Sequence, residues 1–427
     1  MRQKVIFAIT LWALLSGAQS VLANDPDGES SADVMTRARP EYDARGVRVG
    51  TFFLYPSLAG GFGYSSNVFN DASNLTDYFY SISPQLKFQS AWARHELNLS
   101  FDSKSFWFSN QISENRTDWN LAADGRLDFA RGSDISVQVH TTRQSEPRGT
   151  DTTGGLQPGE PAEPTQLSRT GFGAEFHQTF NRIRVTLGAS LEQIDYDDTP
   201  CVVACIPPAI PAVINNDDRD RTVIDLSAKA AVEVTPDTAV FIRGRASDHN
   251  FEADVDDDGF NRDSNSFGID GGVEFSMTHV LAGEIFLGYN VRSYDDPAFA
   301  ENAGFELGAG LKWFPSMLTT IALDAGRSIE DTSIGGASGF VSTRGQVEID
   351  HELLRNVILS GRVGYENAEY QDVLRNDDTL RGGLSGRFLI NNYMHFDAGW
   401  EFIDRSSNAP GFEYTTGQFS LSLTGKM

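Results

Sequence analysis

The ten residues Ser266–Phe275 read SFGIDGGVEF and alternate between apolar and polar positions. In an extended chain, Phe267 and Ile269 fall on one face, while Asp270 and Glu274 fall on the other face. A period of two residues indicates a β-strand with one apolar and one polar surface. The same alternation recurs from residue 52 to the end of the chain, and no segment shows the sustained spacing of an amphipathic helix.

The connections between these segments alternate between short and long. This alternation predicts eighteen strands in an all-β, transmembrane, antiparallel up-and-down β-barrel, with short turns and both termini in the periplasm. Such a barrel is too wide for side chains to fill, so its polar face should line water and its apolar face should meet lipid. The short connections are 91–94, 130–133, 181–182, 235–238, 277–280, 315–317, 352–356 and 391–394, and the long ones are 64–77, 109–116, 145–167, 197–221, 252–263, 295–301, 331–338, 371–377 and 406–411.

The N-terminal region divides into two further parts. Residues 1–23 combine a basic start, a short apolar run and a small-residue cleavage site, which predicts a secretory signal peptide. Residues 24–50 are polar and lack the alternation, so they form either a periplasmic lead-in or a plug of the lumen, and the barrel spans 51–427. The net charge of −25 argues against a nucleic-acid partner.

Aromatic residues gather near the predicted strand ends, which is typical of the two interfacial girdles of a membrane barrel. The row beside the short turns comprises Phe88, Phe129, Phe180, Phe241, Phe275, Trp313 and Phe388. The row beside the long loops comprises Trp107, Tyr196, Phe251, Tyr294, Tyr365 and Phe402.

The polar face supplies the candidate functional residues. Both signs of charge are interleaved on it, and charged rings can hydrate and orient a polar solute. Cross-strand ion pairs that stiffen a wet wall would use the same residues, and the sequence leaves both interpretations open. The predicted pore-lining residues are Arg243, Arg245, Glu284, Arg292, Glu306, Lys312, Arg344, Glu348, Arg362, Arg381 and Arg387.

Signatures of catalysis are sparse. Neither G-x-S-x-G nor H-E-x-x-H occurs, and the seven histidines are spread along the chain. His249 lies near the predicted outer rim among acidic residues, so a barrel-type outer-membrane enzyme is a third-ranked hypothesis. A solvated rim histidine explains the residue more simply, and we expect no catalytic residues.

Two external loops carry other candidate sites. Cys201 and Cys205 are the only cysteines, and in an exported protein they are predicted to form a disulfide. The apolar stretch after them could constrict the mouth. Asp254, Asp256 and Asp258 resemble the start of a calcium loop, although the Glu expected at its twelfth position is missing. Weak calcium binding and a solvated acidic loop tip both fit, and no other cofactor is expected.

Several short motifs resemble the second β-barrel porin family of outer-membrane proteins. They are Tyr55–Leu58 (YPSL), Gly63–Phe69 (GYSSNVF), Ser83–Leu86 (SPQL), Trp92–His95 (WARH) and Asp218–Arg221 (DRDR). The resemblance covers most of residues 47–427, and members of that family are often associated with exopolysaccharide biosynthesis and export.

The leading hypothesis that this resemblance implies is a channel that exports an exopolysaccharide across the outer membrane of a Gram-negative bacterium. The alternative is a general diffusion porin for small hydrophilic solutes, which shares every physical feature described above. The expected partners are outer-membrane lipid and lipopolysaccharide, the polysaccharide, periplasmic polysaccharide-export proteins and the barrel-assembly machinery.

Overall fold

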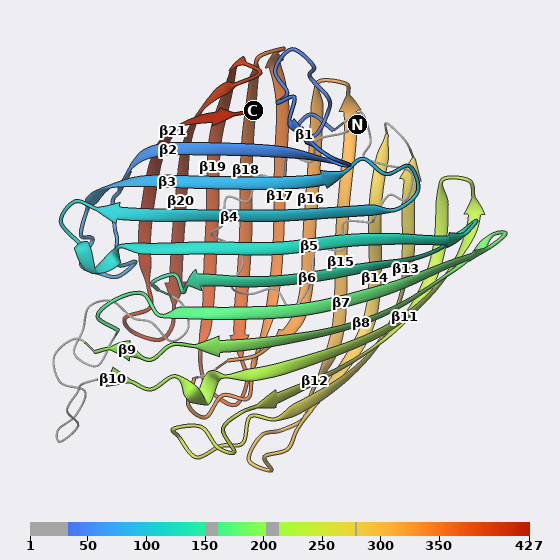
Figure 1. Ribbon diagram of the computed structural model, residues 1–427. Helices are drawn as coiled ribbons and strands as arrows, with labels where there is room; N and C mark the ends of the chain where they lie inside the picture. The colour runs from blue at the N-terminus through green and yellow to red at the C-terminus, as the bar shows by residue number, and fades with distance from the viewer. Residues whose placement is uncertain (1–32, 150–160, 202–212, 278–279, 333) are drawn as a thin grey trace.

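The computed structural model describes residues 33–149, 161–201, 213–277, 280–332 and 334–427. Eighteen antiparallel strands form one closed barrel (Figure 1). The barrel closes where β2 (Phe52–Ser65) pairs with β21 (Tyr414–Lys426). The all-β barrel that the alternation predicts is therefore confirmed. No helix in the described part of the chain is long and apolar enough to cross a membrane.

Each barrel strand pairs with its neighbours in chain order, except that β8 pairs with β11 because a small hairpin intervenes. That hairpin consists of β9 (Thr199–Pro200) and β10 (Val213–Ile214), and two short 3₁₀ helices, η1 (Ile112–Glu114) and η2 (Asp217–Arg219), lie in the long loops. The remaining barrel strands are β3 (Asp77–Ser90), β4 (Glu96–Phe108), β5 (Arg116–Ala130), β6 (Ser133–Ser145), β7 (Gln166–Phe180), β8 (Ile183–Tyr196), β11 (Arg221–Thr235), β12 (Thr238–Phe251), β13 (Ser264–Met277), β14 (Leu281–Tyr294), β15 (Asn302–Ser316), β16 (Thr319–Glu330), β17 (Phe340–Leu354), β18 (Val357–Tyr370), β19 (Asn376–Asn391) and β20 (Met394–Ser407).

All seventeen predicted connections fall between consecutive barrel strands, and the short and long ones alternate as expected. The N- and C-terminal ends of the described chain both lie at the short-turn end of the barrel (Figure 1). There β1 (Val47–Val49) pairs with β2 beyond the point where β21 stops. It thereby covers part of a strand edge that would otherwise have no partner.

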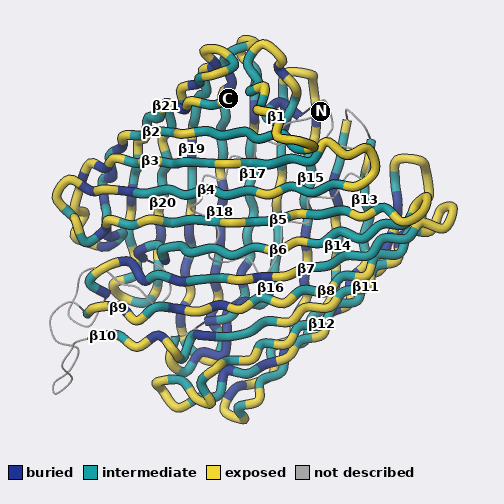
Figure 2. The backbone as a smooth tube through the Cα atoms, in the orientation of Figure 1, coloured by how far each residue is buried: buried dark blue, intermediate teal, exposed yellow. Residues whose placement is uncertain are grey.

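Exposure alternates along the strands, and buried residues gather toward the strand ends and loops instead of forming one central core (Figure 2). On β13, Phe267 and Ile269 are 61% and 50% exposed, whereas Asp270 is 3% exposed. On β13 the apolar side chains therefore face outward and the charged side chains face the lumen. The same parity places all eleven predicted pore-lining residues on the inner face.

The aromatic girdles follow the prediction only in part. Phe241, Tyr196, Phe251 and Tyr294 have the parity of the inner face, and Phe241 packs beneath the ammonium of Lys229, 4.0 Å from its ring centre. Their assignment to the girdles is wrong, because closeness to a strand end does not decide which face a side chain takes. Predicted girdle residues that are strongly exposed are Phe129, Phe180, Trp313, Phe388, Trp107 and Tyr365.

Gly283 is the point in β14 where the backbone departs most from ordinary strand geometry. Its φ is +131°, and a Cβ built there would lie 1.9 Å from the carbonyl oxygen of Gly310 on β15. We expect Gly283→Ala to lower the free energy of unfolding by roughly 1–3 kcal/mol, because both the backbone and the neighbouring strand must shift. Urea unfolding in lipid vesicles measures this change, and Gly345→Ala, where a Cβ meets open space, should leave it unaltered.

Candidate functional site

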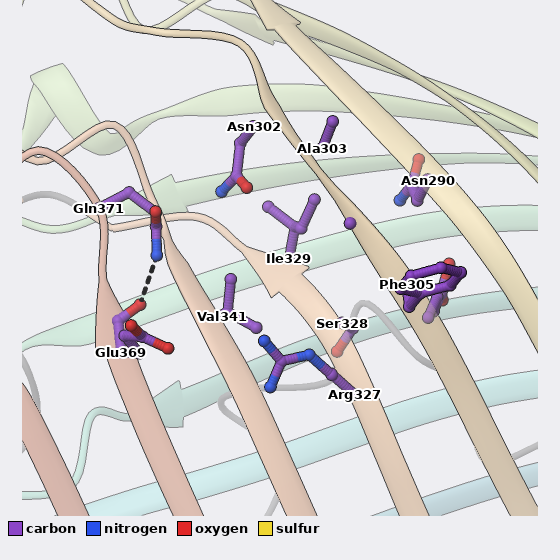
Figure 3. Close-up of a pocket in the computed structure, with 12 residues that line it drawn as sticks. Asn290, Asn302, Ala303, Phe305, Arg327, Ser328, Ile329, Val341, Glu369 and Gln371 are labelled. Carbon is purple, nitrogen blue, oxygen red and sulfur yellow. Dashed lines mark hydrogen bonds between the residues drawn. The ribbon is translucent and has the colours of Figure 1, made fainter.

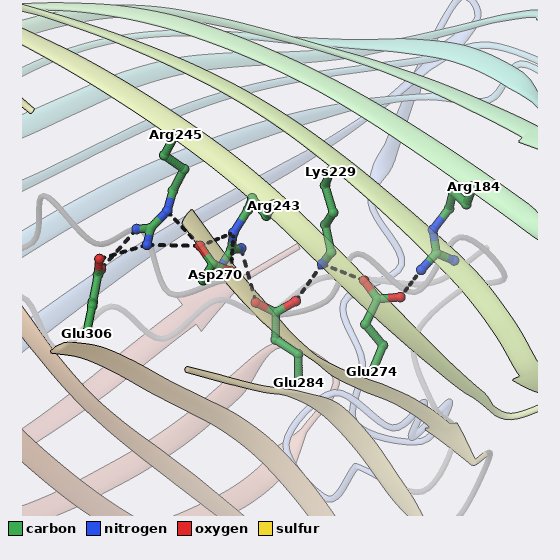
Figure 4. Close-up of polar contacts among 8 residues, drawn as sticks. All are labelled: Arg184, Lys229, Arg243, Arg245, Asp270, Glu274, Glu284 and Glu306. Atoms are coloured by element: carbon green, nitrogen blue, oxygen red, sulfur yellow. Dashed lines mark hydrogen bonds and ion pairs between the residues drawn. The ribbon is translucent and has the colours of Figure 1, made fainter. Parts of the chain in front are cut away.

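A continuous network of charged side chains crosses the inner wall of the barrel (Figure 4). Lys229 on β11 bridges Glu274 and Glu284, with Nζ to oxygen distances of 2.5 and 2.7 Å. Arg243 on β12 continues the network, since its guanidinium lies 3.3 Å from Glu284 and 3.0 Å from Asp270. Acidic and basic side chains thus alternate in space as well as in sequence.

The network extends at both of its ends. Arg245 holds Glu306 with two hydrogen bonds of 2.9 and 2.7 Å, and it also contacts Asp270. At the other end, Arg184 on β8 pairs with Glu274. Asp270 is the central acid, because both Arg243 and Arg245 donate to its carboxylate.

Burial makes this pairing energetically important. The side chain of Asp270 is 0% exposed and that of Glu284 is 2% exposed. A carboxylate withdrawn from water is tolerated only when opposite charges and hydrogen bonds compensate for its lost hydration. The arginines of this region are therefore committed to neighbouring acids, which favours the wall-stiffening interpretation for the network itself.

The structure brings four predicted residues together, namely Arg243, Arg245, Glu284 and Glu306. The other seven predicted residues also lie on the inner face, and six of them, all except Glu348, form the ion pairs that follow. Those pairs are Arg292 with Asp331, Lys312 with Asp33, Arg344 with Glu330, Arg362 with Glu401, Arg381 with Glu366 and Arg387 with Asp397. A role of the predicted pore-lining residues in solute passage stays a prediction.

Sequence reasoning missed the acids at the centre of the network. Asp270 and Glu274 belong to the polar face of Ser266–Phe275, so strand parity alone could have included them. Asp331 is different, because it lies in the loop after β16, where no periodicity applies.

The segment that precedes β1 lies against the inner wall at the short-turn end. Arg37 and Arg39 both pair with Glu352, and the Arg39 Nη2 to Oε2 distance is 2.9 Å. Asp33 pairs with Lys312 at 2.8 Å, and the backbone N–H of Val34 donates to Thr320. The described residues 33–43 thus lie against the inner wall, and both the periplasmic lead-in predicted for residues 24–50 and its alternative, a plug, stay predictions. Residues 1–32, which include the predicted signal peptide, lie outside the described residues.

Val34 anchors this segment through apolar contacts as well. It is fully buried and forms a cluster with Ile358 of β18 and Leu389 of β19, with Met35 and Tyr42 packed against them. Ion pairs and apolar burial thus act on the same short piece of chain. We call residues 33–43 the inner segment.

Loops narrow the opposite mouth. Residues 146–149 follow β6, yet the carbonyl oxygen of Gly149 accepts a hydrogen bond from the inward-facing Arg405 of β20. Arg148 in the same loop pairs with Glu114 at 2.6 Å, and its carbonyl accepts from Asn70. These contacts connect the β6–β7 loop to distant strands across the opening.

Asp331, in the loop after β16, contacts side chains of three strands, β11, β12 and β14. Its carboxylate lies 2.8 Å from both His249 of β12 and Arg292 of β14, and 3.7 Å from Arg221 of β11. Burial alone would raise the pKa of Asp331, but Arg292 and His249 hold that pKa well below its ordinary value. The ionised Asp331 carboxylate therefore links β11, β12 and β14 at the long-loop end of the barrel.

The enzyme hypothesis drew on His249, and its surroundings do not provide a nucleophile. Ser264 stands opposite His249 in the β12–β13 ladder. Among the described contacts, the Ser264 hydroxyl accepts a hydrogen bond from Nε of Arg292 at 3.2 Å and makes none to His249. An activated nucleophile needs a general base within hydrogen-bond reach, and the described contacts do not pair the Ser264 hydroxyl with the imidazole.

The three aspartates of the calcium hypothesis do not converge on a cation site. Asp256 pairs with Arg262 at 2.7 Å and accepts backbone hydrogen bonds from Asp258 and Phe260. Within the described ranges, no group of three or more acidic, histidine or cysteine side chains is arranged to hold a metal. Arg262 thus occupies the carboxylate of Asp256, and weak calcium binding by Asp254, Asp256 and Asp258 stays a prediction.

Arg262 uses its remaining donors to join two loops. Its guanidinium donates to the carbonyl oxygens of Thr332, Ile334 and Ala337 in the β16–β17 loop. Of the predicted disulfide, Cys201 is disulfide-bonded, whereas Cys205 and the apolar stretch at 206–212 lie outside the described residues.

The pKa of Asp220, at the end of the β8–β11 loop, predicts that the free energy of unfolding depends on pH. Burial raises its pKa to about 6, with further repulsion from Asp195 and Asp217. The folded protein therefore keeps a proton that the unfolded chain loses near pH 4. The stability from this group is complete below about pH 4 and is lost as the pH rises through about 6.

We expect Asp220→Asn to remove a pH-dependent contribution to the free energy of unfolding, on the order of 1 kcal/mol, between pH 4 and pH 6. Urea unfolding of the reconstituted barrel across that range measures it. Identical pH profiles for the two proteins would contradict the assignment.

A scan against family models matches residues 39–427 to the family described as "Putative beta-barrel porin 2". The chain belongs to this family. The porin is therefore an outer-membrane β-barrel of a Gram-negative bacterium, and the family resemblance that the short motifs suggested is confirmed. No curated protein matches its sequence.

Solved barrels resemble the porin only distantly. OpdL of Pseudomonas aeruginosa is 10% identical, with a TM-score of 0.44 over 89% of this chain and 99% of that chain. A BenF-like porin of Pseudomonas fluorescens is 9% identical, with a TM-score of 0.45 over 88% and 99% of the two chains. The ferric enterobactin receptor of Pseudomonas aeruginosa, as a double mutant, is 8% identical, with a TM-score of 0.43 over 88% and 80%. Sequence identities and TM-scores this low do not assign a function to the porin by similarity.

Proposed function

We propose that this porin is a diffusion channel for small hydrophilic solutes. The observation that carries the proposal is the combination of a polar, charge-paired inner wall with chain segments inside both ends of the barrel. The inner segment, residues 33–43, contacts β15–β19 at one end, and Gly149 reaches Arg405 at the other. A narrowed polar passage suits small hydrated solutes, and it offers less room to a moving polymer.

The leading hypothesis from the sequence, exopolysaccharide export, came from what the family resemblance implied and not from the residues themselves. The family match supports a porin, which is the more general function. In the structure, the wall charges of the β11–β15 network are satisfied by one another. They therefore leave few free cations or anions with which to hold a charged polymer, and we assign the barrel no reaction.

Reconstitution into liposomes tests the proposal. We expect vesicles that contain the porin to swell in isotonic glucose and to resist swelling in a dextran polymer. In cells, a deletion strain should retain its surface polysaccharide and take up small hydrophilic solutes more slowly. Loss of surface polysaccharide with unchanged solute uptake would reject diffusion and restore export as the function.

A further inference from the structure

The barrel wall separates locally between β15 and β16 toward the long-loop end. The ladder that joins these strands ends at the pair Leu307↔Arg327. β15 nevertheless stays paired with β14 as far as Asn302, and β16 stays paired with β17 as far as Glu330. Both strands therefore continue past their last shared pair without bonding to each other.

A cavity of ≈ 240 Å³ occupies this separation (Figure 3). Asn290 and Asn302, which have the parity of the inner face, line it together with Phe305, Ile329 and Val341 of the outer face. Its lining comes from both faces of the sheet, which places the cavity within the wall between the lumen and the lipid. The space is large enough to hold several water molecules or a small polar head group.

Two polar atoms of this lining lack hydrogen-bond partners. Oδ1 of Asn290 and Nδ2 of Asn302 are buried, and neither has a partner among the described residues. In the β14–β15 ladder, Asn290 stands opposite Gly304 and Asn302 stands opposite Arg292, so the two amides are diagonal neighbours on one face. Buried amides are normally satisfied, so these unpaired atoms indicate a site for a ligand or water. A sugar hydroxyl can both donate and accept, which matches this pair.

Arg327 adds a positive charge on the outer side of the same cavity. It has the parity of the lipid-facing residues of β16, and its Nη1 donates to the hydroxyl of Thr343 at 2.6 Å. Glu369 of β18 has the same outward parity and lines the same cavity, but the described contacts include no ion pair between it and Arg327. A cation on the apolar surface of a barrel is costly unless an anion or a polar head group accompanies it.

The surface beside Arg327 is strongly apolar. Phe305 is 71% exposed on the outer face and meets Tyr289 edge to face, with 5.6 Å between ring centres. Phe305 and Ile329 lie on opposite sides of the separation. An acyl chain placed along them would remain in contact with both the protein and the surrounding lipid.

We infer that the separation between β15 and β16 binds a phosphorylated glycolipid of the outer leaflet. Its phosphate pairs with Arg327, its sugar hydroxyls enter between Asn290 and Asn302, and an acyl chain lies along Phe305 and Ile329. The inference goes beyond solute diffusion, because diffusion through the lumen requires no opening toward lipid. It follows from the broken ladder, the unpaired amides and the outward-facing cation together.

The first test uses lipid A, a bisphosphorylated acylated disaccharide, added to the purified full-length porin in detergent and followed by native mass spectrometry. We expect saturable binding of one molecule per barrel, weakened roughly tenfold by Arg327→Gln, since one charge-assisted contact contributes about that factor. Arg143→Gln is the matched control, because Arg143 is an outward-facing arginine of β6 that pairs with Asp197. Equal affinity in wild type and Arg327→Gln would overturn the inference.

The second test closes the separation with a disulfide. Phe305→Cys/Ile329→Cys places cysteines at the positions that continue the existing register, and Ala309→Cys/Ala325→Cys places them at a pair that already exists. After oxidation, lipid A binding should be lost in the first variant and retained in the second. Retained binding in both variants would overturn the inference. Single-channel conductance of the oxidised first variant should stay unchanged. Loss of lipid A binding with unchanged conductance would show that the lipid site, and not the proposed channel, has been affected.

Discussion

Replacement of Asp270 by Asn is expected to lower the free energy of unfolding by about 3–5 kcal/mol, which is the usual cost of removing one partner from a buried ion pair. Asp270 is fully buried and compensates both Arg243 and Arg245. An amide would leave two guanidinium groups facing each other with one carboxylate fewer between them. Urea unfolding in lipid vesicles, followed by tryptophan fluorescence, measures the change.

Asp225→Asn provides the matched control for this prediction. Asp225 also lies on the inner face of the barrel, on β11, but its exposed carboxylate accepts hydrogen bonds only from the hydroxyls of Ser190 and Ser247. The same chemical change there should alter the unfolding free energy by less than about 1 kcal/mol. Equal losses in the two variants would mean that the network contributes nothing beyond an ordinary polar contact.

Deletion of the inner segment, residues 33–43, is expected to raise single-channel conductance roughly twofold, because the passage widens where the segment now lies against β15–β19. Planar-bilayer recordings of the deletion variant and the wild type measure this effect. The strands themselves are untouched, so the barrel should still show the gel-mobility shift of a folded outer-membrane protein on heating.

A point substitution separates release of the segment from its removal. Glu352→Gln eliminates the carboxylate that pairs with both Arg37 and Arg39, and it should produce frequent transitions to the higher conductance. Glu41→Gln is the control, because its pair with Arg355 is largely exposed. Wild-type conductance in both the deletion and Glu352→Gln would show that the segment does not narrow the passage.

Much of the architecture could be predicted from local patterns. The parity of Ser266–Phe275 correctly assigns Phe267 to the outer face and Glu274 to the inner face, and every predicted turn is found. Such predictions succeed because successive side chains of a strand point to opposite sides, whatever the rest of the chain does. The girdle assignment of Phe241 failed because it ignored this same parity.

The functional contacts could not be predicted in this way. Arg184 and Glu274 are on strands that are not adjacent, and Asp331 meets residues of β11, β12 and β14 from a loop. Asp256 could not be assigned either, because the arginine that occupies its carboxylate follows six residues later in a turn of irregular shape. These contacts depend on how the barrel curves and how its loops fold back.

The sequence by itself determined an eighteen-stranded outer-membrane barrel, the order of its turns and loops, and the inner-face position of the eleven predicted pore-lining residues. Only the tertiary structure decided which charges meet, that residues 33–43 lie against the inner wall, and that β15 and β16 separate after Leu307↔Arg327. The physical reason is one of range. Strand periodicity is set by neighbouring residues, whereas ion pairs across a lumen and a break in one ladder depend on positions far apart in the chain.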